Sequence, residues 1–504
     1  MIRSRPLLAA PAIVLVMAAC GGASTAQQAA LQQAAQQQGA SGAQNAQGNS
    51  NANGSGTNPN AAVPGTGTSA QSSSAAQPGS APGGAAAAPA QGAGGAPAPA
   101  AGSKPGGTVP GPPKPGGVLP QPGAGGATDT GVTASSIKLG HIGIYSGPVG
   151  SFGANLSYAC RATLQTANDQ GGINGRKYDV LVRDDAWDAT KGSAAVRDLV
   201  ERQNVFAMAC TQSVPTNDAI TPYLDQQKVP NVGNDGWGEA QYGGAWSFPV
   251  GASAYNEAQN LADYQVAHGT RKAGVLYLNN TTGQAFADAY TKILEASGGQ
   301  MAVRQAANFD DPGTSTFLAQ CRVNNVDTIT TMVDPGIFAR MVREAAAQGY
   351  KPVHGYSGNA ALYFEVTPSF TGPTAVGTIA AIDWTPDDPA GPSAGSAGYR
   401  QYKQTVEHYY PNIDHSNWTK AAYVGGTMLN EALHRLGLNL TRQRLKDDLD
   451  RLVGFDTGLG PKITFSVGHH RSNKTTYLVQ LQDVGGKLAW KYIAGPIVNP
   501  HVQS

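Results

Sequence analysis

The stretch IKLGHIGIYSGPVGSFG, residues Ile137–Gly153, predicts a buried strand followed by a glycine-rich turn into a helix. Apolar residues then recur at helical spacing from Leu156 to Ala167, and Gly171-Gly172 end the predicted helix. A second strand with alternating apolar residues follows and runs into Asp184-Asp185. Strand, helix and strand in this order are typical of parallel α/β layers.

The same alternation continues along the chain and then restarts. The next predicted elements are helix 190–202, strand 205–209, helix 215–226 and strand 229–232, followed after the restart by strand 274–279, helix 283–296, strand 301–308, helix 315–323, strand 326–333 and helix 335–348. Helices over 398–409, 418–436 and 441–452 and β structure over 462–467, 475–482 and 487–493 complete the prediction. Roughly 370 folded residues exceed what one core holds. The predicted fold class is α/β, with two doubly wound, Rossmann-like lobes.

The N-terminus has the pattern of a signal peptide, predicted over residues 1–19. Two arginines precede an apolar run that is too short to cross a bilayer as a stable helix, and small residues follow it. The segment Met17-Ala18-Ala19-Cys20 resembles the lipobox of bacterial lipoproteins, which implies that Cys20 becomes the acylated N-terminus and anchors the chain to a membrane. The alternative is an ordinary secretory peptide in which Cys20 is incidental.

Residues 20–130 predict a disordered tether rather than a domain. The segment consists almost wholly of Ala, Gly, Gln, Ser, Asn, Pro and Thr, and between Gly21 and Thr130 its charged residues are Lys104, Lys114 and Asp129. Such a composition cannot bury enough apolar surface to offset the entropy of ordering. The segment is expected to hold the folded part away from the membrane; a low-complexity adhesive role is the alternative.

Charge does not define a partner for this chain. The 34 basic and 33 acidic residues leave a formal net charge of +1, so no strong field attracts nucleic acid or an anionic membrane surface. We therefore expect no nucleic-acid partner.

Several segments resemble one family. SGPVGSFG (146–153) and NDQGGINGRKYDVLVRDD (168–185) are the most specific, and LVERQNVFAMACTQS (199–213), NNVDTI (324–329) and AAAQGY (345–350) agree with them. They are similar to the branched-chain amino acid binding proteins of ABC importers, which have the type I periplasmic binding fold. The resemblance covers about 136–495.

The resemblance implies a domain arrangement and a function. One lobe is expected from 131–250 plus 380–455 and the other from 251–379 plus 456–504, with hinge crossings near 248–251, 379–383 and 460–464. Ligand is expected in the cleft, where the lobes close on it. The implied role is an extracytoplasmic lipoprotein that captures a small solute and delivers it to the permease subunits of an ABC importer.

The candidate ligand contacts of the first lobe are residues that come directly after its predicted strands. In open α/β sheets, ligands lie beyond the carboxyl ends of strands, near helix N-termini that favour an anionic group. In the family's motif, Phe152 matches an aromatic wall, and the turn Thr211-Gln212-Ser213 matches donors to a ligand carboxylate. Asp235 and Trp237 match a third contact loop. The alternatives are that Phe152 packs the helix start and that Thr211 caps the following helix.

The second lobe departs from the family's pattern. Ser357 stands where amino-acid binders keep an acid for the ligand ammonium, and Thr282 replaces a usual tyrosine. Asp334 is positioned either to replace that acid or to cap its own helix. Trp187 lies in a loop where some relatives carry a cysteine. These departures lead us to expect a polar, aromatic cleft and a small polar solute: a branched-chain amino acid, an amide or a related compound.

No catalytic set emerges from the motifs. GPVGSFG spaces its glycines as G-x-x-G-x-x-G, which is not the dinucleotide fingerprint, and Ser357 lies in G-Y-S-G-N, which is not a nucleophile elbow. We therefore expect no enzyme activity, no cofactor and no metal. The alternatives to import are ligand sensing with a membrane receptor and, less well supported, an exported enzyme.

Three cysteines remain after Cys20. An export compartment permits disulfides, and Cys160 and Cys210 belong to the same predicted lobe, whereas Cys321 belongs to the other. A Cys160–Cys210 bridge and three buried free thiols are both compatible with the sequence.

Overall fold

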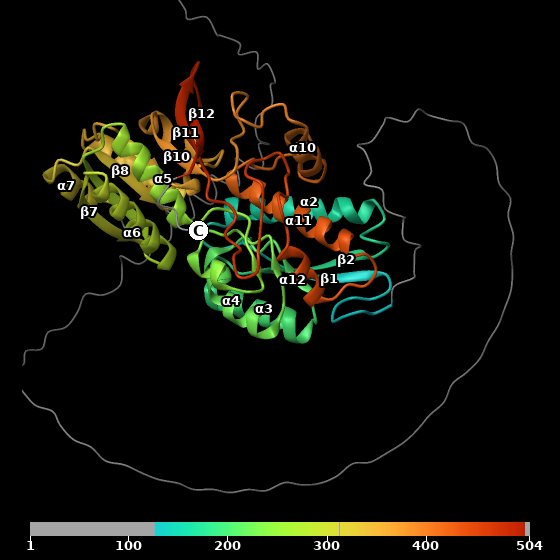
Figure 1. Cartoon of the computed structure of the whole chain (residues 1–504). Coiled ribbons are helices and arrows are strands. Elements are labelled where there is room, and N and C mark those ends of the chain that lie inside the picture. Colours follow the sequence, from blue (N-terminus) through green and yellow to red (C-terminus); the bar gives the residue numbers. More distant parts are fainter. Residues whose placement is uncertain (1–125, 312, 499–504) are drawn as a thin grey trace, which may run out of the picture. The chain divides into compact units, whose positions relative to one another are not determined.

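The structure, a computed structural model, describes residues 126–311 and 313–498. The expected signal peptide, Cys20 and nearly all of the expected tether lie outside these ranges. Within the described ranges, no helix is both long enough and apolar enough to cross a membrane. Figure 1 shows two α/β lobes joined by several chain crossings.

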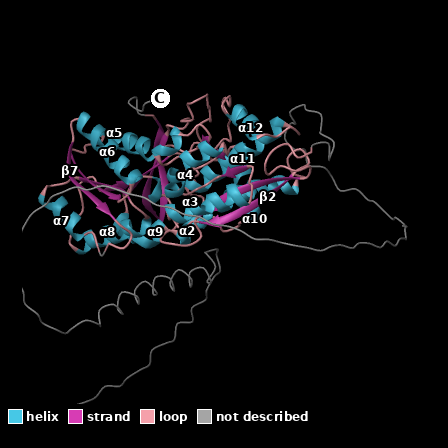
Figure 2. Cartoon of the chain, turned by 90° about the horizontal axis from the view of Figure 1, so that it is seen from below, coloured by secondary structure: helices cyan, strands magenta, loops and turns pink. Residues whose placement is uncertain are grey.

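The secondary structure alternates strands and helices through most of the chain (Figure 2). The strands are β1 (Ser136–Gly143), β2 (Lys177–Asp184), β3 (Ala207–Ala209), β4 (Asn231–Val232), β5 (Ser247–Phe248), β6 (Lys272–Leu278), β7 (Gln300–Ala307), β8 (Thr328–Met332), β9 (Tyr356–Gly358), β10 (Ile379–Ile382), β11 (Thr476–Val484) and β12 (Lys487–Ile497). The helices are α2 (Gly150–Asp169), α3 (Ala189–Arg197), α4 (Val214–Gln227), α5 (Ala254–Ala267), α6 (Thr281–Ala296), α7 (Ser315–Val323), α8 (Pro335–Ala347), α9 (Thr367–Thr371), α10 (Ala397–Tyr409), α11 (Asn417–Leu436) and α12 (Arg442–Leu449). Short helical turns cover Asp198–Arg202, Glu239–Gly243, Ala360–Leu362 and Gly372–Ala375.

The two sheets share one strand order. The first sheet runs β2-β1-β3-β4-β5, and all of its strand pairs are parallel. In the second sheet, β7-β6-β8-β9-β10 repeats that order with parallel pairs, and β11 and β12 add an antiparallel edge. Parallel strands joined by helices give the doubly wound topology, so the predicted fold class is confirmed.

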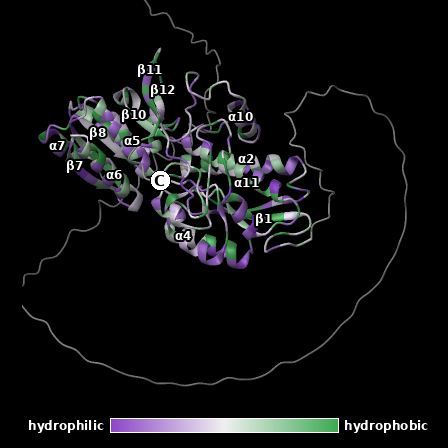
Figure 3. Ribbon diagram, viewed as in Figure 1, coloured by the Kyte–Doolittle hydropathy of each residue, from purple (hydrophilic) through white to green (hydrophobic). Residues whose placement is uncertain are grey.

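Helices from late in the sequence complete the first lobe. The helix α11 packs against α2, and α12 packs against α11. Both α2 and α11 bury apolar residues toward the core and alternate hydrophobic with hydrophilic residues along their length (Figure 3). The chain therefore returns to the first lobe after building most of the second.

The third crossing lies later than the sequence suggested. Leu459, Ile463 and Phe465 pack in the core of the first lobe, so the stretch after 456 still belongs there and the second lobe resumes at β11. Within 462–467, Ile463 forms an isolated bridge with Phe455 and Ser466 forms one with His469, in place of the continuous β structure expected there. The alternating apolar residues of this segment bury a loop against the core. Alternation alone cannot distinguish such a loop from a strand in a sheet.

The cysteines differ between the lobes. Cys160 of α2 and Cys210, directly after β3, form a disulfide with an S–S distance of 2.09 Å. Cys321 of α7 is a buried free thiol in the second lobe. The disulfide fixes the first helix to the strand end that leads into the Thr211 turn.

Candidate functional site

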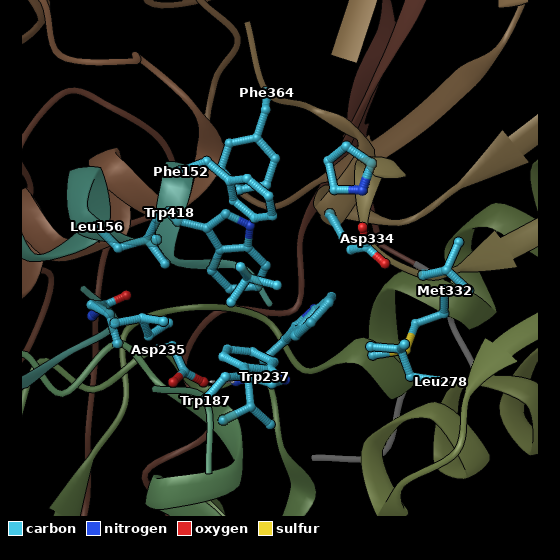
Figure 4. Close-up of a pocket in the computed structure, with 18 of the residues that line it drawn as sticks. Phe152, Leu156, Trp187, Asp235, Trp237, Leu278, Met332, Asp334, Phe364 and Trp418 are labelled. Atoms are coloured by element: carbon cyan, nitrogen blue, oxygen red, sulfur yellow. Dashed lines mark hydrogen bonds between the residues drawn. The ribbon is translucent and has the colours of Figure 1, made fainter. Parts of the chain in front are cut away.

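An apolar cavity lies between the lobes, with about 560 Å³ of empty space that is partly open to solvent. Its lining comes from both lobes (Figure 4). The first lobe contributes Ile144, Val149, Phe152, Gly153, Leu156, Trp187, Gln212, Val214, Asp235, Trp237 and Trp418, and the second contributes Leu278, Phe309, Met332, Val333, Asp334, Pro335, Ala361 and Phe364.

The sheet topology explains this position. In each sheet the strand order reverses beside the first strand of the repeat, between β1 and β3 and between β6 and β8. Helices leave in opposite directions at such a point, which opens a crevice at the carboxyl ends of the strands. The residues that follow these four strands supply much of the lining.

Trp187 is held at the cavity by an unusual loop conformation. Ala186 and Trp187 both have left-handed backbone, with φ of 54° and 63°. The two preceding aspartates compensate, because Asp184 accepts from the Ala186 N–H and Asp185 accepts from the Trp187 N–H, each at 3.0 Å. A β-carbon at Gly147 would come within 2.2 Å of the Ala186 carbonyl oxygen, so that position requires glycine. Such local strain is concentrated at functional sites.

Aromatic rings form the walls of the cavity. Trp237 and Trp418 meet edge to face with ring centroids 4.6 Å apart. Phe152 of the first lobe meets Phe364 of the second at 4.8 Å, so this pair bridges the cleft. One continuous apolar cluster includes residues of both lobes, which means that the structure has the lobes in contact around the cavity.

Asp235 reaches the cavity but is fully occupied by its own lobe. Its Oδ1 accepts from the Trp237 N–H at 2.7 Å and from Gln241 at 2.8 Å, and its Oδ2 accepts from Asn217 at 2.7 Å. Burial raises the pKa of Asp235 to about 6, although these donors lower it. The carboxylate thus positions Trp237, its neighbour in the expected contact loop.

Asp334 combines a structural bond with an unused oxygen. Its Oδ1 caps α8 by accepting from the Gly336 N–H at 2.7 Å and more weakly from Ile337 at 3.3 Å. Its Oδ2 is buried and has no hydrogen-bond partner in the described part of the chain. Burial raises the pKa of Asp334, and its N–H donors and Arg340 lower it. Both roles considered from the sequence, cap and cavity group, are therefore open to this residue.

The Thr211-Gln212-Ser213 turn contributes less side-chain surface than expected. All three residues are buried, and Gln212 is the one that lines the cavity. Gln212 Nε2 donates to the Gly233 carbonyl oxygen at 2.9 Å, and its Oε1 is buried and unpartnered among the described residues. Thr211 and Ser213 do not line the cavity; the turn that contains them leads into the start of α4.

Two expected contacts do not line the cavity. Thr282 donates to Asp218 Oδ2 at 3.3 Å, which links the lobes at one side of the cleft. Ser357 is sealed in the second lobe, where it accepts from Gln265 Nε2 at 2.5 Å and bonds Thr330 at 2.9 Å. Ser357 is therefore a core residue and not a vacated ammonium site.

Buried carboxylates lie behind Trp237. Glu257 accepts from the Trp237 indole N–H at 3.0 Å, and Asp383, directly after β10, accepts from the Ala252 N–H at 2.5 Å. The bond from Asp383 ties the first two crossings together. Burial raises the pKa values of both acids. Among residues 126–311 and 313–498, no group of His, Cys, Asp or Glu is arranged to hold a metal ion.

The lining corrects the expected polarity. The sequence led us to expect a polar and aromatic cleft; the lining is rich in aromatic rings, but its polar side chains among the described residues are Gln212, Asp235 and Asp334 alone. Sequence reasoning missed Phe309, Phe364 and Trp418. Phe364 follows the carboxyl end of the strand that contains Ser357, and this position could have marked it as a lining residue. Trp418 comes from a helix far along the chain, and nothing in the sequence marked it.

A cavity between two doubly wound lobes of equal strand order is the arrangement of a two-lobed binding protein. The family model for periplasmic binding proteins matches residues 136–487. The chain belongs to this family, so the family expected from the sequence is confirmed.

Named relatives agree with this assignment. The chain is 23% identical over 239 residues to Leu/Ile/Val-binding protein homolog 1 of Brucella suis, a match that covers 46% of this chain and 63% of that protein. The chain thus spans less than two thirds of the length of the curated relatives it matches.

Similar solved structures support the fold. A fatty acid ABC transporter substrate-binding protein from Thermomonospora curvata has a TM-score of 0.65 and 21% identity, covering 73% of this chain and 95% of that one. A branched-chain amino acid ABC transporter protein from Thermus thermophilus with bound valine has a TM-score of 0.64 and 16% identity, covering 73% and 97%. A solute-binding protein from R. palustris in complex with 4-hydroxybenzoate has a TM-score of 0.62 and 17% identity, covering 71% and 96%.

Proposed function

We propose that this chain is the solute-binding protein of an ABC importer and that it captures a small, largely apolar solute between its lobes. The observation that carries the proposal is the interlobe cavity, whose walls come from both lobes and consist mainly of aromatic and aliphatic side chains. A solute that fills such a cavity gains the free energy of removing its apolar surface from water, at about 25 cal/mol per Å². Capture without chemistry is the role that this lining supports.

The apolar lining narrows the solute class suggested by the sequence. A sugar or other highly hydroxylated solute would bury many polar groups against walls that offer few partners, at a cost of about 1–3 kcal/mol for each unpaired group. The solutes in the names of the similar structures, a fatty acid, valine and 4-hydroxybenzoate, each contain an apolar body. This supports an apolar body for the solute of this chain as well.

Contacts between the lobes provide the closing mechanism. The Phe152–Phe364 pair and the Thr282–Asp218 hydrogen bond join the lobes on different sides of the cavity. A solute that touches both walls binds the closed form better than the open form, so it shifts the population toward closure. Closure then presents the surfaces of both lobes together to the permease subunits.

The proposal places the folded domain outside the cytoplasmic membrane on a lipid-anchored tether. The disulfide between Cys160 and Cys210 is the kind that persists in oxidising compartments. Metabolic labelling with a palmitate analogue tests the anchor: the full chain is expected to incorporate the label and Cys20→Ser to lose it. Equal labelling of both proteins would exclude lipidation at Cys20.

A thermal-shift screen tests capture. Hexanoate, phenylacetate, L-leucine, L-phenylalanine and phenethylamine represent apolar bodies, with glucose and L-glutamate as polar comparisons. A solute at one hundred times its Kd stabilises the folded state by about 2.7 kcal/mol, so at least one apolar solute is expected to raise Tm. A response to the polar solutes alone, or to none, would contradict the proposal.

A pair of variants locates the response. Phe364→Ala removes the ring that crosses the cleft, so it is expected to weaken binding at least tenfold. Phe455→Ala is the matched control, because Phe455 packs against the core of the first lobe and does not line the cavity. The intrinsic fluorescence of Trp187, Trp237 and Trp418 gives an independent titration.

A further inference from the structure

The second lobe reaches the solute cavity through the short segment Tyr363-Phe364-Glu365, which directly follows the helical turn Ala360–Leu362. The Phe364 ring lines the cavity and meets Phe152 of the first lobe at 4.8 Å (Figure 4). Tyr363 and Glu365 do not line it. Together with Phe364 they line a second, more polar cavity with about 900 Å³ of empty space that is partly open to solvent. Phe364 therefore links the solute cavity to a separate region of contact between the lobes.

The first lobe binds this segment on both sides of Phe364. Asp414 Oδ2 accepts from the Glu365 N–H at 3.0 Å, and the Asp387 N–H donates to Tyr363 Oη at 2.7 Å. Asp387 follows β10 and Asp414 precedes α11, in the part of the chain that returns to the first lobe. Both hydrogen bonds therefore run from one lobe to the other.

Each side of this contact is fixed to its own lobe. In the first lobe, the neighbouring residues Trp384 and Ile413 are buried in the core. In the second lobe, Trp490 of β12 donates its indole N–H to the Phe364 carbonyl oxygen at 3.3 Å, and Phe364 itself is packed in the core cluster. Because neither side belongs to a free loop, the two hydrogen bonds join the lobes as bodies, and separation of the lobes breaks them.

Asp414 is buried at this contact. The residue is 8% exposed, and its Oδ1 has no hydrogen-bond partner in the described part of the chain. Burial raises the pKa of Asp414 to about 8, and the nearby Glu365 carboxylate adds to the shift, whereas the Glu365 N–H and Lys420 lower it. An uncharged acid accepts a hydrogen bond through its carbonyl oxygen, as an asparagine amide does. The bond to Glu365 therefore requires an acceptor oxygen at this position and not a negative charge.

On this basis we propose that Asp414 is a positioning residue for solute capture: by binding the backbone next to Phe364 it holds the lobes closed and keeps the Phe364 ring against the solute. Asp414 does not line the solute cavity, so it acts without touching the solute. The bond between Asp387 and Tyr363 supports the same segment from the other side. The inference rests on the proposed function and adds a residue outside the cavity lining.

A residue of this kind has a characteristic effect on affinity. A contact that forms on closure, and not with the solute, changes the equilibrium between the open and the closed form. It therefore multiplies the affinity for every solute by the same factor. A residue that touches the solute, such as Phe364, affects each solute differently. Because the contact forms after the solute has entered, its loss is expected to speed dissociation and to leave association nearly unchanged.

Asp414→Ala and Asp414→Asn test the assignment. Every apolar solute that binds in the thermal-shift screen is titrated into the full chain by tryptophan fluorescence, and its dissociation is followed by stopped flow. Loss of one hydrogen bond between the lobes is expected to weaken each solute by about fivefold or more in Asp414→Ala, by the same factor within about twofold, through faster dissociation. Asp414→Asn keeps an acceptor oxygen and is expected to bind within about twofold of the unaltered protein.

Asp225→Ala is the matched control. The Asp225 carboxylate also accepts backbone N–H groups, from Ala245 at 2.9 Å and Trp246 at 2.8 Å, but all three residues belong to the first lobe and none lines the solute cavity. The variant is expected to lose folding stability and to keep its affinity within about twofold, because both bonds are equally present in the open and the closed form.

Tyr363→Phe gives an independent measurement at the other side of the segment. The change removes the oxygen that accepts from Asp387 and keeps the aromatic ring, so the fold is retained even if Asp414→Ala does not fold. It is expected to weaken all solutes by one common factor of about threefold or more. Combined with Asp414→Ala, the two factors are expected to multiply.

Contrary results have separate meanings. Unchanged affinity in folded Asp414→Ala and Tyr363→Phe proteins, or a loss in Asp414→Asn as large as in Asp414→Ala, would overturn the positioning role. A loss that differs more than about fivefold between solutes would instead show direct contact of Asp414 with the solute and would overturn it as well. In each of these cases the unaltered protein binds a solute, so the proposed function stands. If no apolar solute binds the unaltered protein, the proposed function falls and the positioning role falls with it.

Discussion

The two lobes meet the cavity with walls of different construction. In the first lobe, Asp235 accepts three hydrogen bonds, from Trp237, Gln241 and Asn217, and the disulfide of Cys210 fixes the neighbouring strand end. In the second lobe, Asp334 holds its helix with one oxygen and leaves the other unused, and Cys321 is a free thiol. The contrast indicates that the wall of the first lobe is held more firmly than the wall of the second.

The largest effect is expected from opening the disulfide of the first lobe. The bridge closes a loop of 50 residues, and in the chain-entropy account such a crosslink stabilises the folded state by about 4 kcal/mol. The paired change Cys160→Ala and Cys210→Ala is expected to lower the free energy of unfolding by that amount in urea titrations. Cys321→Ala in the second lobe serves as the comparison and should cost about 1 kcal/mol. Similar losses in both variants would remove the claimed asymmetry.

A smaller loss of folding stability is expected from removing the Asp235 carboxylate. Asp235→Ala leaves donors of Trp237, Gln241 and Asn217 without their acceptor, at about 1 kcal/mol or more for each, so the total is about 3 kcal/mol. Asp334→Asn, which keeps a cap, is expected to change stability by less than about 1 kcal/mol. Denaturation of both proteins without ligand measures the difference, and a more damaging Asp334→Asn would show that the second lobe depends on its carboxylate more than the first lobe does.

A third variant tests whether Ser357 of the second lobe contributes to stability or to ligand affinity. Ser357→Ala removes the acceptor of Gln265 and a partner of Thr330, so it is expected to cost about 1–2 kcal/mol of stability. Because Ser357 does not line the cavity, the affinity for any solute found in the screen is expected to stay within twofold. Tenfold weaker binding at unchanged stability would return Ser357 to the list of ligand contacts.

The sequence predicted the architecture better than the site. The switch from alternating to helical periodicity after Tyr145 marks a βαβ unit locally, and its restart near Gly274 marks a second lobe, so both could be found without structure. The direction of a side chain at a strand end depends on how the turn folds, which is a tertiary property. Hence five of the residues predicted to contact ligand line the cavity, Phe152, Gln212, Asp235, Trp237 and Asp334, whereas Thr211, Ser213, Thr282 and Ser357 do not; ligand contact itself stays a prediction.

The smallest expected effect concerns pH and the contact between the lobes at Asp218. Burial raises the pKa of Asp218 to about 7, and its neighbour Asp235 adds to the shift. The folded chain therefore keeps a proton that the unfolded chain releases above about pH 4, and its stability falls as pH rises toward 7 and stays lower above it. Burial likewise raises the pKa of Asp414 to about 8. Burial lowers the pKa of His141 to about 4, and a lowered pKa costs stability only below about pH 6.5.

Burial also lowers the pKa of Lys420 to about 8, which costs stability as pH falls toward 8 but not below it. Between about pH 8 and 6.5 the acids dominate, and acidification is expected to raise Tm. Asp218→Asn keeps a side chain of the same size beside Thr282 and removes one of the titrating groups. Its Tm is expected to exceed that of the unaltered protein by on the order of 1–2 °C at pH 8.5 and to equal it only below about pH 4, where aspartate is protonated in the unfolded chain as well. Asp188→Asn, on the solvent side of the first lobe, should leave the pH profile unchanged. A profile that is flat from pH 8 to 6.5 in the unaltered protein would show that these acids ionise freely.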